Sequence, residues 1–370
     1  MTERKRTAGL SADAADSIDR LVKADDRPRG VPGQTPGLLQ SIVLDEIEDG
    51  DLHRAARAII DALPAIHSSR TNMQEKLNSL LFLSRVVQDA GGAKHGKAKL
   101  AGKLRSIRRY TESIDIPPGG YLELGCGAHD PVTVATFFHL NGLNPVWAID
   151  TQPPRSPLFS ALSMYDVLAH MKMFPERYLW RDNQISDLLL RLERIDVAAF
   201  ERGDFYNGLA SFAGQVQLVN ARFEEAPVAP NSIALLTSHA VLEHVDNIDG
   251  VFSHSFAIMV PGGVAFHFAD LIDHRFYRGD GAFGPLGFLT EVHAPANCNR
   301  LRACEISAAA LRAGFEIVAD RRTTAEMTDA VRAALVAPFA TMPEVDVAVI
   351  KQQLVLRKPV AFKTGQSNAS

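Results

Sequence analysis

The 370-residue chain has little cysteine, little net charge and no long apolar run. Its three cysteines, Cys126, Cys298 and Cys304, are odd in number and lack a metal-like spacing, so a disulfide framework is disfavoured and a reducing cytoplasm is expected. The formal net charge of −4 argues against a general nucleic-acid binder, for which a basic domain is typical. No uninterrupted apolar run reaches the ~20 residues of a membrane span, and the N-terminus lacks the apolar segment of a signal peptide. These absences predict a globular protein without a membrane anchor.

A glycine-rich turn over residues 123–127 (sequence ELGCG) follows a short apolar strand that begins near Tyr121. Glycine has no Cβ and tolerates positive φ, so the backbone at Gly125 and Gly127 can approach a ligand closely. The helix expected next, over residues 131–140, directs its free N–H groups back at the same place. The turn therefore predicts a ligand cradle.

A second buried strand is expected over residues 144–150 and ends on Asp150. Strand, glycine turn, helix, strand and acid begin a doubly wound α/β sheet, in which ligands bind at the carboxyl ends of the strands. Further strands are expected at residues 216–220, 232–238, 264–269, 315–320 and 345–356, and helices at residues 306–313, at 325–337 and up to about Met259. The pattern predicts an α/β fold with a mostly parallel, seven-stranded sheet.

The two ends of the chain differ in composition from its middle. Residues 1–35 are rich in charge, glycine and proline, which predicts a flexible arm. Residues 36–112 carry apolar residues at helical spacing, chiefly over 38–63 and 74–88, and predict a helical N-terminal cap. The polar residues 359–370 are expected to form a tail.

The main domain, expected over residues 113–358, carries a long insertion after its second strand, at residues 151–214. This stretch is longer than the usual few loop residues plus one helix, and it is rich in aromatic residues and methionine. Two interpretations remain open. It is a helical lid that covers the ligand end of the sheet and shapes an acceptor pocket, or it is a structural helical layer.

A run of basic residues lies between the cap and the glycine turn, from Lys94 to Arg109, with no acidic residue among them. It is either a patch for an anionic acceptor or a solvated helix face. The second interpretation is favoured.

The glycine turn can be compared with three ligand-binding motifs. A P-loop requires a lysine after its second glycine, and none follows here. A dinucleotide fingerprint requires a third glycine where this chain has Asp130, whose charge would repel a pyrophosphate. Glu123 instead places a carboxylate beside the turn, which suits a ligand with an ammonium group, such as the methionine end of S-adenosylmethionine.

On these motifs, the chain resembles the class I S-adenosylmethionine-dependent methyltransferases over residues 119–356. Residues 122–127 look like the family's first motif, 238–245 like its fourth-strand motif and 260–263 like the turn before its fifth strand. The resemblance implies a Rossmann-like class I methyltransferase fold with S-adenosylmethionine as cofactor.

By the same resemblance, a set of residues would hold the cofactor. They are Glu123, Gly125, Cys126 and Gly127 for its amino-acid end, Asp150 for its ribose hydroxyls, Phe223 and Glu224 for its adenine, and Ser238 in the fourth-strand motif. Two positions depart from the family pattern. His129 replaces the third glycine of the first motif, and Arg222 stands where an aspartate is frequent.

Methyl transfer is an in-line displacement on an activated donor, so the protein mainly aligns the acceptor and excludes water. A hydroxyl acceptor also needs a base. Residues just after the fourth and fifth strands lie over the donor in this topology, and the candidates are His239, Asp270, Asp273 and His274. We favour His274 as the base, with Asp270 or Asp273 as its orienting partner.

Three neighbouring residues receive a structural interpretation. Glu243 and His244 are expected to stabilise the helix start and line the cofactor site, and Cys126 to pack as a small residue in the turn.

A metal site is the alternative for the residues after the fifth strand. Asp270, Asp273 and His274, with His293 further on, have the residue types of a divalent-metal site that would acidify an acceptor hydroxyl. The spacing does not fix three ligands on one face, so no metal is predicted.

The sequence therefore predicts a cytoplasmic S-adenosylmethionine-dependent methyltransferase that methylates oxygen on a small-molecule or glycan-type acceptor. Two alternatives stay open. One is a non-catalytic binding or regulatory module of the same fold, and the other is an RNA or protein methyltransferase recruited by the basic run. Nucleic-acid and membrane partners are disfavoured, and a homodimer is left open.

Overall fold

The computed structural model describes residues 96–128, 130–154, 163–164, 167–168, 170–195, 216–278, 284–293 and 298–360. These residues form two compact units that alternate along the chain. The first unit contains residues 96–102, Gly127–Gly142 and the described part of Gln152–Gln217, and the second contains Lys103–Cys126, Leu143–Thr151 and residues 218–360. The expected arm, both expected helices of the cap and His129 lie outside the described residues.

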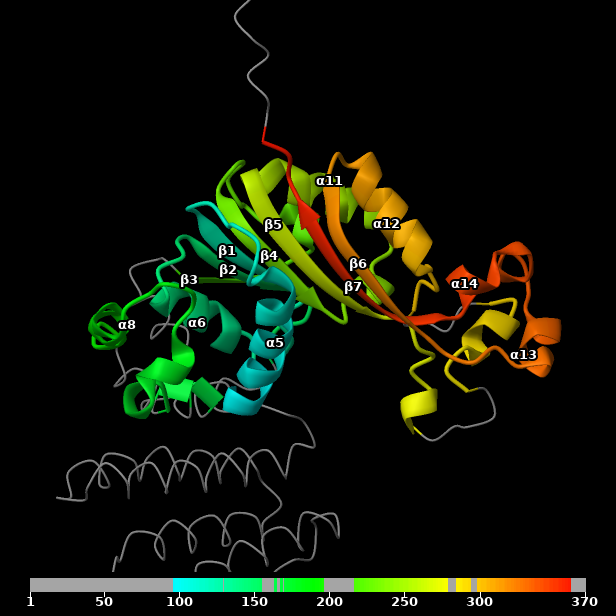
Figure 1. The fold of residues 1–370 in the computed structure, drawn as a ribbon, viewed down its shortest axis with the longest axis horizontal. Coiled ribbons are helices and arrows are strands. Elements are labelled where there is room, and N and C mark those ends of the chain that lie inside the picture. Colours follow the sequence, from blue (N-terminus) through cyan, green and yellow to red (C-terminus); the bar gives the residue numbers. More distant parts are fainter. Residues whose placement is uncertain are drawn as a thin grey trace, which may run out of the picture. The chain divides into compact units, whose positions relative to one another are not determined.

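A seven-stranded sheet is the centre of the second unit (Figure 1). Its strands are β1 (Gly120–Leu124), β2 (Val146–Asp150), β3 (Val216–Asn220), β4 (Ile233–His239), β5 (Met259–Asp270), β6 (Glu316–Thr324) and β7 (Val349–Arg357). The order across the sheet is β3-β2-β1-β4-β5-β7-β6. β1 is parallel to β2 and β4, and β4 to β5, whereas β7 is antiparallel to both β5 and β6. The predicted Rossmann-like fold with a mostly parallel seven-stranded sheet is confirmed, and the strand order reverses between β1 and β4, where such sheets bind ligands.

The helices connect these strands. The α-helices are α5 (Gly96–Thr111), α6 (Thr133–Leu140), α8 (Ile185–Leu192), α11 (Ile248–Ile258), α12 (Ala303–Arg312), α13 (Asp329–Ala334) and α14 (Glu344–Val347). Short 3-10 turns are η2 (Pro175–Tyr178), η3 (Phe223–Glu225), η4 (Leu242–His244), η5 (Phe276–Arg278), η6 (Gly287–Thr290) and η7 (Phe339–Thr341).

The expected start of the last strand is wrong. Residues 345–347 belong to α14, in which the main-chain N–H groups of Asp346 and Val347 donate to the carbonyl of Pro343 at 3.0 and 3.1 Å. Pro343 provides a helix start that the apolar pattern of the segment did not reveal. The strand itself begins at Val349.

The expected start of the fifth strand is also wrong, because β5 already includes residues 259–263. Gly262 has φ +81, and its N–H donates to the carbonyl of Lys358 at 2.8 Å, just beyond the end of β7. The positive φ lets the strand pass through an irregularity while it stays paired.

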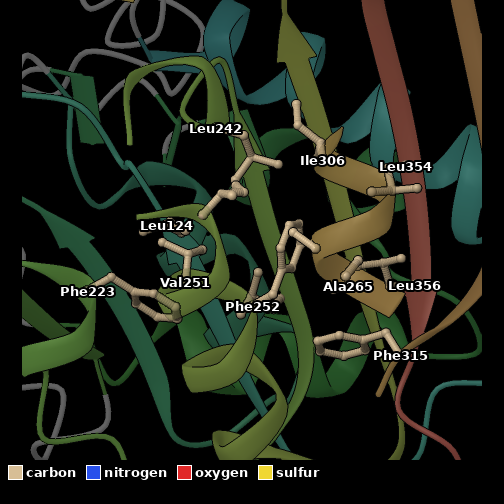
Figure 2. Close-up of a cluster of buried hydrophobic side chains, with 14 of the residues drawn as sticks. Leu124, Phe223, Leu242, Val251, Phe252, Ala265, Ile306, Phe315, Leu354 and Leu356 are labelled. Atoms are coloured by element: carbon tan, nitrogen blue, oxygen red, sulfur yellow. The ribbon is translucent and has the colours of Figure 1, made fainter. Parts of the chain in front are cut away.

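One face of the sheet is covered by α11 and α12, with the main hydrophobic core between helices and strands (Figures 1 and 2). Phe252 of α11 is fully buried and meets Phe315 edge-on, with ring centroids 6.4 Å apart. Burial of such a side chain stabilises the fold by about 1.5–3 kcal/mol. Leu124 of β1 and Ala265 of β5 lie in the same core, which therefore fixes the strand ends relative to one another.

The opposite face of the sheet carries the second half of α5. Tyr110 stacks on Phe266 of β5 with ring centroids 5.6 Å apart, and the guanidinium of Arg321 lies 5.5 Å from the centroid of the Tyr110 ring. Phe266 alternates along β5 with Ala265, so it faces away from the α11 and α12 core.

In the first unit, the described part of the predicted insertion packs on α6. The side chain of Asn141, at the end of α6, accepts from the N–H of Trp180 at 2.7 Å. The Trp180 ring meets Phe138 edge-on, with centroids 5.1 Å apart, and Arg191 of α8 donates to the carbonyl of Leu140 at 3.1 Å. These contacts agree with a structural layer, and the lid interpretation stays a prediction.

Candidate active site

The turn after β1 has a backbone that requires glycine. Gly125 has φ +69, its N–H donates to the carbonyl of Ile149 at 2.8 Å, and a Cβ there would overlap the side chain of Val241. Gly127, in the first unit, has φ +88. Both angles lie in the left-handed region that favours glycine. Each of the two positions therefore favours glycine over a residue with a side chain.

Glu123 lies fully buried in β1, on the face that carries α5. Its Oε1 is in an ion pair with Lys103 of α5. Its Oε2 has no hydrogen bond within the described part of the chain. A buried acceptor without a donor is costly, so this oxygen fits a ligand that donates. The ammonium group of the predicted cofactor is such a donor.

The basic run is partly used inside the protein. Lys103 pairs with Glu123 in the second unit, and Lys99 donates to the main-chain carbonyl of Asp130 in the first. Other members of the run, such as Arg105, are exposed. The run is therefore not a purely solvated face.

The ends of β2 and β3 are held together by hydrogen bonds to the main-chain carbonyl of Asp150. It accepts from the N–H of Ala221 at 3.2 Å and from the side chain of Asn220 at 3.0 Å. These bonds fix Asp150 at the carboxyl end of β2, where ligands bind in such sheets.

The two residues expected near the adenine lie on η3. Phe223 is 4% exposed and meets His254 of α11 edge-on, with ring centroids 4.8 Å apart. Burial lowers the pKa of His254, and the charge of the half-buried Glu224 offsets part of that shift. Phe223 is thus a member of the core, and the adenine contacts of both residues stay predictions.

Ser238 lies inside the sheet and not on an open surface. Its Oγ is 2.8 Å from Nδ1 of His267, and both side chains are fully buried. Burial lowers the pKa of His267 to about 3, so its ring is neutral. The Ser238 hydroxyl therefore has an internal partner.

His239 ends β4 on the face that carries α5. Its ring centroid lies 5.5 Å from that of Phe266 and 6.2 Å from that of Phe268, both in β5. The next residue, Ala240, has φ +53, and its N–H donates to the carbonyl of Phe268 at 2.8 Å. Ring packing and this sharp turn orient His239.

The two aspartates after β5 have different partners. Asp270 accepts from the hydroxyl of Tyr277 at 2.8 Å. Asp273 is buried and accepts from the guanidinium of Arg275 at 2.6 Å, and Arg275 also pairs with Glu291 at 2.7 Å. Burial alone would raise the pKa of Asp273, but the hydrogen bonds and charge of Arg275 outweigh it and hold that pKa below its usual value. Asp273 therefore fixes the loop through Arg275.

His274 is half-buried, and its ring lies against the main chain of Asp270. The predicted pair thus meets through the backbone of Asp270, whose carboxylate accepts from Tyr277. Burial lowers the pKa of His274, and the neighbouring His244 lowers it further. A neutral imidazole ring keeps a lone pair on one of its nitrogens.

His274 forms a cluster with His244 and Cys298. One nitrogen of each histidine and the Sγ of Cys298 lie within 4.8 Å of one another, and the two rings have centroids 5.0 Å apart. Glu243 is 3% exposed, with its Oε1 4.0 Å from Nε2 of His244. Burial, and to a lesser extent the charge of Asp270, raise the pKa of Glu243 to about 8. Neither carboxylate oxygen has a hydrogen bond of regular geometry within the described residues.

Asn299 holds this cluster together. Its main-chain N–H donates to the carbonyl of Glu243 at 2.9 Å, and its side chain donates to the carbonyls of Leu242 and Val245 at 2.7 and 2.9 Å. Cys298, the preceding residue, is thereby placed against η4. Burial, and then the charges of nearby carboxylates, raise the pKa of its thiol to about 11.

The sequence predicted that Glu243 and His244 stabilise the helix start and line the cofactor site, and it predicted no role for Cys298. Their approach to His274 depends on contacts between segments that are distant in the chain. The one local signal was an acid and an imidazole side by side directly after β4.

The sequence profile of the methyltransferase domain family matches residues 96–320. The chain belongs to this family. It is an S-adenosylmethionine-dependent methyltransferase, and S-adenosylmethionine is its cofactor. The predicted enzyme class and cofactor are confirmed. The comparison with curated proteins gives no significant match.

Solved structures similar to this methyltransferase include several methyltransferases. One is an S-adenosylmethionine dependent methyltransferase from Mesorhizobium loti, with 13% identity, TM-score 0.36, and 70% of this chain and 99% of that chain covered. A second is geranyl diphosphate C-methyltransferase from Streptomyces coelicolor, with 9% identity, TM-score 0.36, and 79% and 86% covered. A third is phosphoethanolamine N-methyltransferase 2 from Haemonchus contortus, with 14% identity, TM-score 0.35, and 70% and 52% covered.

The described part of the methyltransferase contains no helix with both the length and the apolar character needed to cross a bilayer.

Proposed function

We propose that the methyltransferase methylates a hydroxyl of a small-molecule or glycan-type acceptor at the carboxyl ends of β4 and β5. S-adenosylmethionine supplies an activated methyl group, so the C–S bond breaks as the acceptor oxygen forms its bond to the methyl carbon. The hydroxyl proton must leave in the same process. The protein's part is to hold both molecules in line and to help remove that proton.

The observation that carries the proposal is the state of His274. Its ring lies against the main chain of Asp270, and burial lowers its pKa, so a lone pair is available at neutral pH. A lone pair can accept the acceptor's proton directly, a role worth roughly 10²–10⁴-fold in rate. It can also hold a cation that acidifies the hydroxyl. In either case O-methylation depends on His274, supported by Asp270 and by the loop that Asp273 fixes.

The cofactor contacts are proposed residue by residue. The free oxygen of Glu123 receives the ammonium group, the backbone at Gly125, Cys126 and Gly127 holds the amino-acid end, and Asp150 receives the ribose hydroxyls. The buried Oε2 of Glu123 and the two positive φ angles support this assignment. Ser238 contributes its main chain, because its hydroxyl is bonded to His267.

A small acceptor is supported by the use of basic residues inside the protein. Lys99 and Lys103 are engaged with Asp130 and Glu123, so two cations of the run have internal partners. We propose the insertion over residues 151–214 as a lid for the acceptor, and a cytoplasmic location from the three free thiols.

The test is His274→Gln, with His293→Gln as the matched control, since His293 is exposed on a nearby loop. Transfer of labelled methyl groups is measured on a panel of hydroxyl-bearing and amine-bearing small molecules and glycans, and cofactor binding by calorimetry. We expect unchanged cofactor affinity and a loss of roughly 10²–10⁴-fold in transfer for His274→Gln only. Full turnover in that variant, or transfer restricted to nitrogen acceptors, would contradict the proposal.

The charge reversal Arg105→Glu tests the competing idea of recruitment through the basic run. A small-acceptor enzyme should keep its activity, because Arg105 is exposed. Loss of activity in the folded variant would favour an RNA or protein acceptor instead.

A further inference from the structure

Three metal-binding donor atoms converge where β4 and β5 end: a ring nitrogen of His244, a ring nitrogen of His274 and the Sγ of Cys298, all within 4.8 Å of one another. In tetrahedral zinc sites, Zn–N bonds of ~2.0–2.1 Å and Zn–S bonds of ~2.3 Å place the donors roughly 3.3–3.8 Å apart. Small side-chain rotations would close this difference, and the His244 side chain is 39% exposed. We propose that these three side chains bind a Zn²⁺ ion.

The donor types decide the class of metal. Mg²⁺ and Ca²⁺ prefer oxygen ligands, whereas two imidazoles and a thiolate suit Zn²⁺. In the oxygen-rich set considered from the sequence, Asp273 pairs with Arg275 and one oxygen of Asp270 accepts from Tyr277, whereas Oδ1 of Asp270 has no hydrogen bond within the described residues. Among the described residues, the donors that converge on one point are two nitrogens and one sulfur.

Groups outside the site surround two of the three ligands. The ring of His274 lies against the main chain of Asp270. Cys298 is held against η4 by the three hydrogen bonds of Asn299 to the carbonyls of Leu242, Glu243 and Val245. Contacts from residues outside the cluster therefore hold His274 and Cys298 in place.

A separate observation points to a cation. Glu243 is 3% exposed, lies 4.0 Å from Nε2 of His244, and has no hydrogen bond of regular geometry on either oxygen within the described residues. Burial of an ionised carboxyl group is costly, and a nearby divalent cation offsets that cost and favours the ionised form. Glu243 completes the negative surroundings of the ion without being one of its three ligands.

Three protein ligands leave one position of a tetrahedral ion open, which is the pattern of catalytic zinc sites. This step rests on the proposed function. An acceptor hydroxyl in the open position would have its pKa lowered by the ion, and its proton would pass to solvent water on the exposed side of His244. His274 then promotes O-methylation as a ligand of the ion.

The first experiment measures metal binding without any acceptor. The full-length protein is stripped with a chelator, titrated with Zn²⁺, and analysed for metal content. A Co²⁺-loaded sample is examined for a thiolate-to-cobalt charge-transfer band in the near ultraviolet. We expect about one ion per chain and a clear band.

Variants identify the ligands. Cys298→Ser should abolish the band and weaken Zn²⁺ binding by more than the ~10–100-fold that outer-shell partners contribute. Cys304→Ser, which changes another half-buried thiol, should leave both unchanged. His244→Asn is a second variant at an exposed side chain, and circular dichroism with cofactor binding confirms that each variant is folded. Failure of the stripped, folded protein to take up Zn²⁺, or unchanged affinity in Cys298→Ser, would overturn the site.

Different experimental results would contradict the zinc proposal and the O-methylation proposal. Hydroxyl methylation at full rate by the metal-free protein would overturn the ion's role in the reaction and leave O-methylation standing. Zinc binding through Cys298, with no hydroxyl acceptor methylated, would support the site and overturn the proposed function.

Discussion

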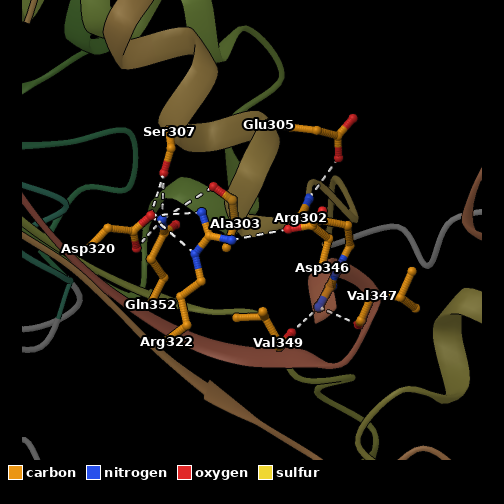
Figure 3. A network of polar contacts seen from close by, with 10 residues as sticks. All are labelled: Arg302, Ala303, Glu305, Ser307, Asp320, Arg322, Asp346, Val347, Val349 and Gln352. Carbon is orange, nitrogen blue, oxygen red and sulfur yellow. Dashed lines mark hydrogen bonds and ion pairs between the residues drawn. The ribbon is translucent and has the colours of Figure 1, made fainter. Parts of the chain in front are cut away.

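Two groups of buried polar side chains in the second unit differ in how completely they are paired. Between α12 and strands β6 and β7, the amide nitrogen of Gln352 donates to Ser307 and Asp320, each at 2.9 Å, and Asp320 also pairs with Arg322 (Figure 3). Where β4 and β5 end, neither oxygen of Glu243 has a regular hydrogen bond within the described residues. Side chains that are hydrogen-bonded to each other hold helices and strands together. A buried acceptor that lacks a hydrogen bond can still accept one from a ligand.

The difference between the two groups is one of degree, because Oε1 of Gln352 also has no hydrogen bond within the described residues and Arg302 is only partly paired. Its Nη2 donates to the carbonyls of Val347 and Val349, and its guanidinium lies 6.0 Å from the ring centroid of Phe288. Its Nε and Nη1 have no hydrogen bond within the described part of the chain. Burial lowers its pKa to about 10, so it stays charged at neutral pH. Arg302 therefore links the start of α12 to β7 through the hydrogen bonds of its Nη2.

The largest effect that we predict is the pH dependence of stability that comes from the buried side chain of His267. His267 has a native pKa of about 3, against about 6.5 in the unfolded chain. Between these values the unfolded chain binds a proton that native His267 does not, so the free energy of unfolding falls as the pH falls from about 6.5 towards 3. The loss is at most about 5 kcal/mol over the whole window, and about 2 kcal/mol by pH 5.

Urea unfolding near pH 7 and near pH 5 checks this prediction on the wild type and on His267→Gln, which removes the titrating ring. The variant should lose about 2 kcal/mol less than the wild type over that interval. Ser238→Ala is the control, because it removes the hydrogen bond to His267 but keeps the imidazole. Equal acid losses in wild type and His267→Gln would show that His267 is not the group responsible.

Much of the fold could be predicted because its signals are local. The apolar run at Val216–Asn220 was bounded correctly as β3. Asp150 was placed correctly at the end of β2, since it closes an apolar run. The error at residues 345–347 arose because a helix start at Pro343 outweighed the apolar pattern.

The site was less predictable, since its parts meet only in the folded chain. The glycine turn and Glu123 stand in one short segment and were recognisable as a motif. The partner of Glu123, Lys103, was placed in a basic run without an assigned contact, and the partner of Ser238, His267, was not foreseen. Cys298 reaches His274 only through the hydrogen bonds of its neighbour Asn299, which no spacing reveals.

A smaller effect is expected from breaking the paired network. Gln352→Leu removes the amide that bonds Asp320 and Ser307, and it leaves buried acceptors without a donor. We expect a loss of about 2–3 kcal/mol in the free energy of unfolding, with transfer activity kept at temperatures where the variant is folded. Denaturant unfolding and activity assays on the same samples check both parts.

The control for that variant is Arg312→Ala. It breaks the exposed ion pair with Asp249, which should contribute no more than about 1 kcal/mol. A stability loss in Gln352→Leu no larger than in Arg312→Ala would mean that the network contributes little to stability.

The smallest effect on stability is expected at the unpaired group. Glu243→Gln keeps the shape of the side chain and removes an acid that has no regular hydrogen bond to lose within the described residues. Its free energy of unfolding should therefore stay within about 1 kcal/mol of the wild type, measured on metal-free protein. Zn²⁺ affinity should fall, because the buried carboxylate near His244 no longer offsets the charge of the ion. A large stability loss with unchanged Zn²⁺ affinity would make Glu243 a structural group like Gln352 and remove the distinction between the two regions.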